Sequence, residues 1–144
     1  MKKSSLTVRH SVDVPAHKMW ETISAIGGVD VWFSSLIKSC EVIGEGVGAT
    51  RICRTEAGPI NERIEAIDHD NRIFRYSISE QNLLPVDNFL GTMKVEEEGA
   101  GSAVVWTAEF TVAAAAEAEV HTNIHQLYVT GVEGIANLHR LQAA

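Results

Sequence analysis

Two histidines near the C-terminus have the spacing of a metal-binding pair. His121 and His125 are four residues apart in a helical segment, so both rings lie on one side of the helix. The zinc-metalloprotease pattern requires a glutamate directly after the first histidine, and this chain has Thr122 there. A third ligand is not evident in the sequence. We therefore expect no metal, and interpret the pair as two partly exposed residues beside an apolar stripe.

The serines and the glycine-rich segment of this chain lack the motifs that nucleophilic catalysis or dinucleotide binding would require. Ser24, Ser34 and Ser35 have no G-x-S-x-G sequence around them, so nucleophilic catalysis has no support. The glycine-rich segment 44–48 is not a dinucleotide fingerprint, because a strand rather than a helix is expected after it. We expect no cofactor.

The two cysteines fall in a predicted β-hairpin that covers residues 36–56. A turn centred on the glycine-rich segment places Cys40 opposite Cys53 and Val42 opposite Arg51. Opposed cysteines can form a disulfide, but a cytoplasmic compartment keeps thiols reduced. We interpret the two cysteines as small apolar residues on one face of the hairpin.

The composition is that of a soluble globular protein. The chain has 144 residues, of which 45% are apolar and 22% are charged, and this length fits one domain over residues 1–144. Its net charge of −7 argues against a nucleic-acid partner, because phosphate binding requires a positive surface. The basic N-terminus is followed by no apolar run, so we expect no signal peptide, no stable membrane insertion and a cytoplasmic location.

A long helix is predicted over residues 115–141. Apolar or small residues recur there at steps of three and four, namely Val120, Ile124, Leu127, Gly131, Ile135, Leu138 and Leu141. Gly131 and Gly134 each cost about 1 kcal/mol of helix propensity relative to Ala. Either they let the helix sit close to a sheet, or they leave space beside it for a ligand.

The remainder of the chain reads as strands and two short helices. Alternating apolar and polar residues predict strands over residues 6–14, 36–45, 49–56, 60–67, 72–80, 88–96 and 103–112. Short helices are expected over residues 16–26 and 29–35. Short turns between consecutive strands predict an antiparallel meander, so the fold class is α+β, with a curved sheet around the long helix.

The order of these elements resembles the START-like superfamily (SRPBCC), which includes polyketide cyclases and birch-pollen-allergen proteins. The most telling segments are Gly-Val-Gly-Ala-Thr-Arg at 46–51 and Glu-Arg-Ile-Glu-Ala-Ile-Asp at 62–68. Segments 37–40 and 137–141 are similar to the plant abscisic-acid receptors of the same superfamily. The resemblance implies a helix-grip fold, in which a seven-stranded antiparallel sheet wraps around the C-terminal helix. Its cavity, between sheet and helix, binds lipids, hormones, polyketides or other apolar molecules.

Carried over by position, the resemblance implies a set of ligand-binding residues. They are Leu36, Arg51, Cys53, Thr55, Glu62, Tyr76, Ile78, Phe89, Glu109, Gly134 and Asn137. The lid of the cavity is expected to consist of Trp32, Phe33, Leu83, Leu84 and Pro85. Ser34 stands where the hormone receptors carry a ligand-binding lysine, and the turn at 57–59 is shorter than their gate loop. Both departures argue against abscisic acid as the ligand.

The polar members of this set allow three interpretations. Arg51 and Glu62 could form an ion pair that orients strands and does no chemistry. The polar groups could instead bind the polar end of a mostly apolar ligand. In the third interpretation Glu62 or Glu109 is a general base whose pKa is raised by the apolar cavity, as a polyketide cyclase or dehydratase would require.

The sequence therefore supports three functions. The first is binding of a small, mostly apolar molecule, such as a lipid, a polyketide-like compound or an aromatic compound. The second is a cyclase or dehydratase that uses Glu62 or Glu109. The third is a protein-binding module that docks through the apolar tip at residues 83–86. A monomer or a homodimer is compatible with each.

Overall fold

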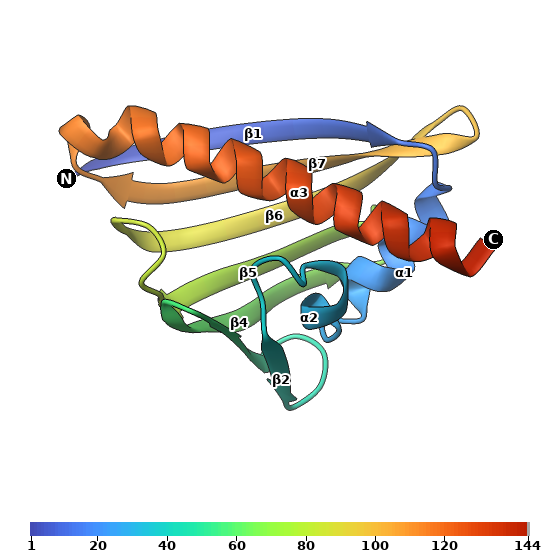
Figure 1. Cartoon of the computed structure of the whole chain (residues 1–144), viewed down its shortest axis with the longest axis horizontal. Coiled ribbons are helices and arrows are strands. Elements are labelled where there is room, and N and C mark those ends of the chain that lie inside the picture. Colours follow the sequence, from blue (N-terminus) through green and yellow to red (C-terminus); the bar gives the residue numbers. More distant parts are fainter. Residues whose placement is uncertain (144) are drawn as a thin grey trace.

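The computed structural model describes residues 1–143 and consists of one antiparallel sheet with three helices on its concave side (Figure 1). The elements are β1 (Lys2–Val12), α1 (Ala16–Ser24), α2 (Val29–Trp32), β2 (Ser39–Ile43), β3 (Thr50–Thr55), β4 (Gly58–Asp68), β5 (Ile73–Glu80), β6 (Val86–Glu98), β7 (Gly101–Val112), a 3₁₀ turn (Ala114–Ala116) and α3 (Glu117–Ala143). The predicted α+β helix-grip architecture is confirmed.

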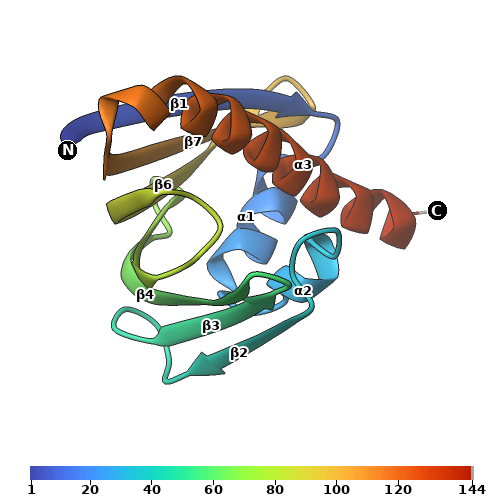
Figure 2. The same ribbon diagram turned by 60° about the vertical axis from the view of Figure 1, so that its left-hand side comes forward.

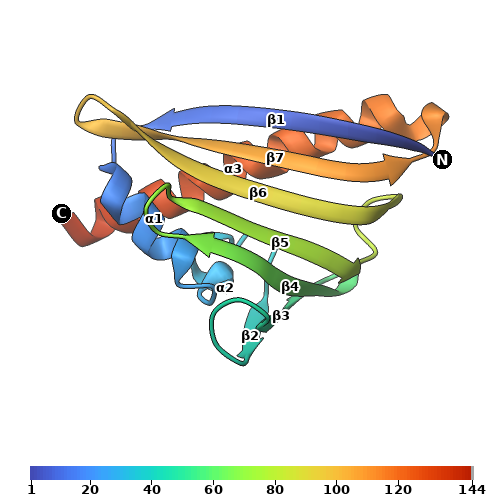
Figure 3. The ribbon, with the colours of Figure 1, turned by 180° about the vertical axis from the view of Figure 1, so that it is seen from behind.

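The seven strands lie in the order β1-β7-β6-β5-β4-β3-β2, and all neighbouring pairs are antiparallel. Consecutive strands from β2 to β7 are neighbours, whereas β1 joins the far edge beside β7. Figure 3 shows the convex face of this sheet, which no helix covers. In Figure 2 the sheet curves so that α1 and α2 lie between α3 and the end of the sheet formed by β2 and β3.

The hairpin of β2 and β3 has the predicted register, with Cys40 opposite Cys53 and Val42 opposite Arg51. The predicted strand over residues 36–45 is too long, since β2 begins at Ser39 and ends at Ile43. The residues before it instead turn back onto α2.

The buried face of α3 differs in part from the predicted stripe. Its buried residues are Val120, Ile124, Tyr128, Gly131, Val132, Ile135 and Ala136. Leu127 packs against the core only in part, and Leu141 is 77% exposed. The stripe thus follows the helical period through Tyr128 rather than Leu127. None of the helices within residues 1–143 is both long and apolar enough to span a lipid bilayer.

The two glycines of α3 allow close packing. A Cβ at Gly134 would overlap the carbonyl oxygen of Trp32 at the end of α2, and a Cβ at Gly131 would lie 3.0 Å from the Phe33 ring and 3.1 Å from the Trp106 ring. The interpretation in which these glycines leave space for a ligand is therefore wrong. They allow close packing, but the neighbour of Gly134 is the end of α2 rather than the predicted sheet, and the neighbours of Gly131 include Trp106 of β7. The contact at Gly134 fixes the distance between α3 and α2.

This contact predicts whether a substitution at Gly134 raises or lowers the free energy of unfolding. Gly→Ala on an open helix surface stabilises by about 1 kcal/mol. At Gly134 the added methyl group meets backbone, so we expect Gly134→Ala to lower the free energy of unfolding by about 1–3 kcal/mol, as overpacking does. Urea denaturation measures it.

Gly131→Ala is the matched control, because its Cβ would meet side-chain rings at 3.0 and 3.1 Å and would not overlap backbone. We expect a smaller loss there. A Gly134→Ala protein more stable than wild type would show that α3 does not sit against the Trp32 carbonyl.

Candidate ligand-binding cavity

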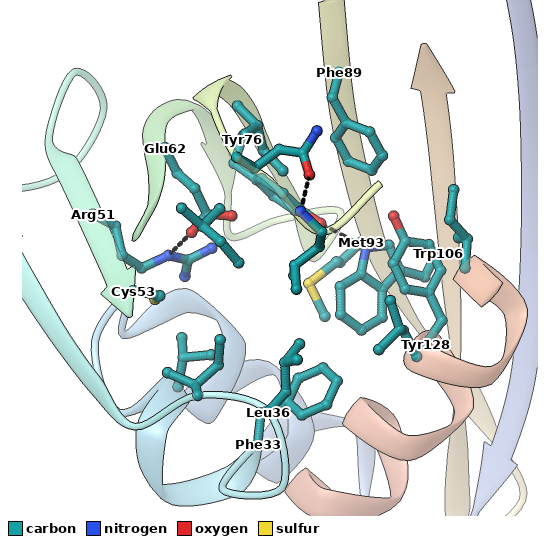
Figure 4. A pocket seen from close by; sticks show the side chains of 18 of the residues that line it. Phe33, Leu36, Arg51, Cys53, Glu62, Tyr76, Phe89, Met93, Trp106 and Tyr128 are labelled. Atoms are coloured by element: carbon teal, nitrogen blue, oxygen red, sulfur yellow. Dashed lines mark hydrogen bonds and ion pairs between the residues drawn. The ribbon is translucent and has the colours of Figure 1, made fainter. Parts of the chain in front are cut away.

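An apolar cavity of about 120 Å³ lies between the concave face of the sheet and the three helices (Figure 4). Strands β3 to β7 form its floor, and α1, α2 and α3 cover it. The lining residues are Ile23, Val29, Trp32, Phe33, Leu36, Ile37, Arg51, Cys53, Ile60, Glu62, Phe74, Tyr76, Ile78, Gln81, Leu83, Leu84, Val86, Phe89, Met93, Trp106, Ile124, Leu127 and Tyr128. Most of these side chains are aliphatic or aromatic.

Aromatic rings make one end of the cavity flat and rigid. Trp106 of β7 and Tyr128 of α3 stack with ring centroids 3.9 Å apart and an angle of 6° between the ring planes. Tyr76 and Phe89 lie on the neighbouring strands with centroids 6.4 Å apart (Figure 4). Rings of this kind bury large areas with few rotatable bonds, so they hold the shape of the cavity.

A buried ion pair occupies the other end. Arg51 Nε lies 2.6 Å from Glu62 Oε1, and less than a tenth of either side chain is exposed. The two residues are direct cross-strand partners on β3 and β4, which explains the short distance. The guanidinium also lies 5.5 Å from the ring centroids of Phe74 and Tyr76. The positive charge of Arg51 is therefore compensated inside the protein.

Arg51 also fixes the connection between α1 and α2. Its Nη1 donates a hydrogen bond of 2.8 Å to the carbonyl oxygen of Ile26. Ile26 has a φ of +69°, a conformation that β-branched residues rarely adopt. Burial by itself would lower the pKa of Arg51, but the adjacent Glu62 carboxylate outweighs it and holds that pKa above its ordinary value. The guanidinium stays charged and holds the strained connection.

The cavity also contains hydroxyl and indole groups. Trp106 Nε1 donates a hydrogen bond of 3.1 Å to the Tyr76 hydroxyl. Among buried side chains of residues 1–143, only Tyr128 Oη and Trp32 Nε1 lack a hydrogen-bond partner. Burial is the main cause that raises the pKa of both Tyr76 and Tyr128, so both phenols are neutral at physiological pH.

An outer groove of about 380 Å³ lies next to the cavity. The cavity and the groove share five apolar side chains, and we call these five the gate: Phe33, Leu36, Leu83, Leu84 and Leu127. The groove is otherwise lined by the polar residues Ser35, Asn123, Gln126 and Thr130. A path from solvent to the cavity thus passes from polar to apolar surroundings through the gate.

Gln81 shapes the loop that carries half of the gate. Its Oε1 accepts hydrogen bonds from the backbone nitrogens of Leu83 and Leu84 at 2.8 and 2.9 Å. Its Nε2 donates to the Leu84 carbonyl at 2.8 Å. These bonds fold the tip inward, so both leucine side chains line the cavity and pack against the core.

Most of the predicted site residues lie at this cavity. The structure brings together Leu36, Arg51, Cys53, Glu62, Tyr76, Ile78 and Phe89. The lining also includes four of the five expected lid residues, which are Trp32, Phe33, Leu83 and Leu84.

Five predicted positions lie elsewhere, so their expected places at the cavity are wrong. Glu109 is exposed, because β7 alternates and its neighbours Ala108 and Phe110 face the core. The exposed residue Pro85 points to solvent, and so does Asn137, which accepts a hydrogen bond from Arg140. Thr55 is buried but bonds to the β3–β4 turn, and Gly134 packs on α2.

The prediction found Tyr76 and Phe89 at the aromatic end of the cavity but missed Trp106, Tyr128 and the neighbouring Met93. Trp106 and Met93 are direct partners on β7 and β6, and Tyr128 faces them from α3. Trp106 is in phase with Ala108 and Phe110 and alternates with Thr107 and Glu109, which was a visible signal for an inward position. Tyr128 lies four residues after Ile124, at the helical spacing, so its inward position was also visible.

The two histidines of α3 do not form a metal site. His121 Nε2 lies 2.7 Å from Ser4 Oγ, and His125 is exposed. Within the 143 described residues no group of three or more His, Cys, Asp or Glu side chains is placed to hold a metal ion.

Comparisons with known proteins agree with this geometry. The family described as polyketide cyclase / dehydrase and lipid transport matches residues 3–143. No curated protein sequence matches the chain.

Three solved structures are similar in fold. An uncharacterised protein from Bacillus thuringiensis is 25% identical, with a TM-score of 0.77 over 94% of this chain and 98% of that one. Norcoclaurine synthase from Thalictrum flavum, in complex with dopamine and hydroxybenzaldehyde, is 17% identical, with a TM-score of 0.79 over 95% and 86%. The protein Ara h 8.0201 is 19% identical, with a TM-score of 0.78 over 95% and 97%.

The buried ion pair generates a stability prediction. Glu62→Gln leaves the Arg51 guanidinium buried without a counter-charge, so we expect the free energy of unfolding to fall by about 3–5 kcal/mol. The double variant Arg51→Met/Glu62→Leu removes both charges and should recover part of this loss, because it also removes the hydrogen bond to the Ile26 carbonyl. Urea denaturation of the three proteins measures both effects.

Glu65→Gln is the matched control on the same strand. Its partner Arg63 lies 2.8 Å away but is 61% exposed, so this pair contributes at most about 1 kcal/mol. If Glu62→Gln costs no more than Glu65→Gln, water reaches Arg51 and the description of the pair as desolvated is wrong.

Proposed function

We propose that the inner cavity of this protein, which belongs to the polyketide cyclase / dehydrase and lipid transport family, binds a small, mostly apolar molecule. Members of this family bind small hydrophobic ligands. The observation that carries the proposal is an apolar cavity lined by two buried polar atoms, Tyr128 Oη and Trp32 Nε1, that form no hydrogen bond of good geometry within residues 1–143, although the Tyr76 hydroxyl lies close enough to influence the pKa of Tyr128. A buried polar group without a partner costs free energy that a bound molecule can recover.

The size of the cavity points to a single ring. At about 120 Å³ it is smaller than the 300 Å³ or so that drug-sized ligands occupy. It is close to the engineered cavity of about 150 Å³ that binds benzene. Norcoclaurine synthase, which has the same fold, was solved with dopamine and hydroxybenzaldehyde, and each has one aromatic ring. A larger ligand would place its ring inside and extend past the gate into the polar groove.

The charges favour a neutral ligand. The only cation that lines the cavity, among the described residues, is Arg51, and Glu62 neutralises it at 2.6 Å. A carboxylate would lose its hydration without gaining a free counter-charge. A phenol or an aldehyde can instead bond to the Tyr128 hydroxyl. We therefore propose a neutral aromatic compound with one hydrogen-bonding oxygen.

This proposal is favoured over the two other functions. As a general base, Glu62 would have to take a proton and leave Arg51 without its counter-charge, and the other expected base, Glu109, is exposed on β7. A docking module would present its apolar tip to solvent, whereas Leu83 and Leu84 line the cavity.

The charge argument predicts a ligand preference. We expect p-cresol to raise the Tm of the protein. The compound p-toluate has the same ring and methyl group but a charged substituent, and at equal concentration we expect its Tm shift to be at most one third of that of p-cresol. Differential scanning calorimetry measures both. A larger shift with p-toluate would show that Arg51 is available to anions, and no shift with either would count against a single-ring site.

The position of the cavity predicts where binding can be blocked. Leu127→Trp places a large ring between cavity and groove, so we expect the affinity for p-cresol to fall at least tenfold in calorimetric titration. Leu141→Trp is the matched control on the same helix, because Leu141 is 77% exposed. Equal affinities in the two variants would place the binding site elsewhere.

A further inference from the structure

The two cysteines form a close pair at the edge of the sheet. Cys40 and Cys53 face each other across β2 and β3, and their sulfur atoms lie 3.0 Å apart. Directly opposed residues of an antiparallel pair have Cα atoms about 4.5–5.5 Å apart, within the range that a disulfide spans. A bond of about 2.05 Å between the sulfurs requires only a small closure of the side chains.

The two thiols differ in solvent exposure and in the direction in which their pKa is shifted. Cys53 is 2% exposed and lines the cavity, whereas Cys40 is half-buried and open to solvent. The Cys53 thiol donates its hydrogen to the Cys40 sulfur, and this hydrogen bond is the main cause that lowers the pKa of Cys40, against the opposing effect of partial burial. Cys40 is thus the sulfur that a reagent in solution reaches first, and it is the better nucleophile.

We propose that Cys40 and Cys53 are a reversible redox site, which a small disulfide such as oxidised glutathione converts to an intramolecular disulfide. In the first step the Cys40 thiolate attacks one sulfur of the oxidant and forms a mixed disulfide with it. The S–S bond of the oxidant breaks, and its other sulfur leaves as a thiol that carries the proton released by Cys40. In the second step the Cys53 sulfur attacks Cys40, displaces the second thiol and gives up its proton to it. Two protein thiols are oxidised, and one disulfide of the oxidant is reduced to two thiols.

The location gives this reaction a structural effect. β2 is an edge strand, and β3 is its only neighbour in the sheet. The disulfide would join the two strands covalently beside Arg51 and its cavity. The inference depends on the geometry of the hairpin alone, so it holds whether or not the cavity binds a ligand.

The test is mass spectrometry of the purified, folded protein after equilibration in glutathione buffers of increasing oxidised fraction. We expect wild type to lose the mass of two hydrogen atoms, with no glutathionyl group retained, and to recover its mass in dithiothreitol. Peptide mapping without reductant should link Cys40 to Cys53.

Two variants separate the steps. Cys53→Ser keeps the accessible sulfur, so it should stop at the mixed disulfide and retain one glutathionyl group. Cys40→Ser keeps only the buried sulfur and should react at least tenfold more slowly. The proposal is wrong if the wild-type protein stays reduced in fully oxidised glutathione. It is equally wrong if the wild-type protein retains a stable glutathionyl group or forms a disulfide between two chains. Because the wild-type result decides alone, a variant that fails to fold does not weaken the test.

Discussion

The bond between Arg51 and Glu62 is the interaction on which the site depends. It is made by cross-strand partners, and the same guanidinium bonds to the carbonyl of Ile26, so one side chain joins two strands to the segment between α1 and α2. That segment positions α2, against which α3 packs through Gly134. The pair also leaves the cavity without net charge, so the stability of the fold and the chemistry of the cavity share one cause.

The cavity persists because its walls come from rigid elements that cannot move closer. α3 is held by backbone contact at Gly134 rather than by adaptable side chains, and the stacked rings of Trp106 and Tyr128 resist compression. Well-packed interiors are stiff, so a space bounded by such contacts does not collapse. Within residues 1–143 the hydroxyl of Tyr128 forms no hydrogen bond of good geometry inside this space, so it is a polar group that the proposed ligand could bond.

Much of the fold could be predicted from sequence, because strand alternation and the helical period report directly on burial. The register of Cys40 and Cys53 followed from one symmetric turn. The predicted place of Glu109 at the cavity was wrong. It was carried over from the resemblance, whereas the alternation of β7 places this side chain on the outer face of the sheet. The size of the cavity could not be predicted, because it depends on the contact between Gly134 and the Trp32 carbonyl, and no periodicity encodes it.

The gate has a kinetic consequence. It consists of side chains, chiefly leucines, and Gln81 holds the loop that carries Leu83 and Leu84 by hydrogen bonds. Rotation of such side chains takes nanoseconds to microseconds, which is far faster than unfolding a strand or a helix. The proposed ligand would therefore exchange without unfolding of a strand or helix, and its residence time would depend on its fit in the cavity rather than on the opening of the gate.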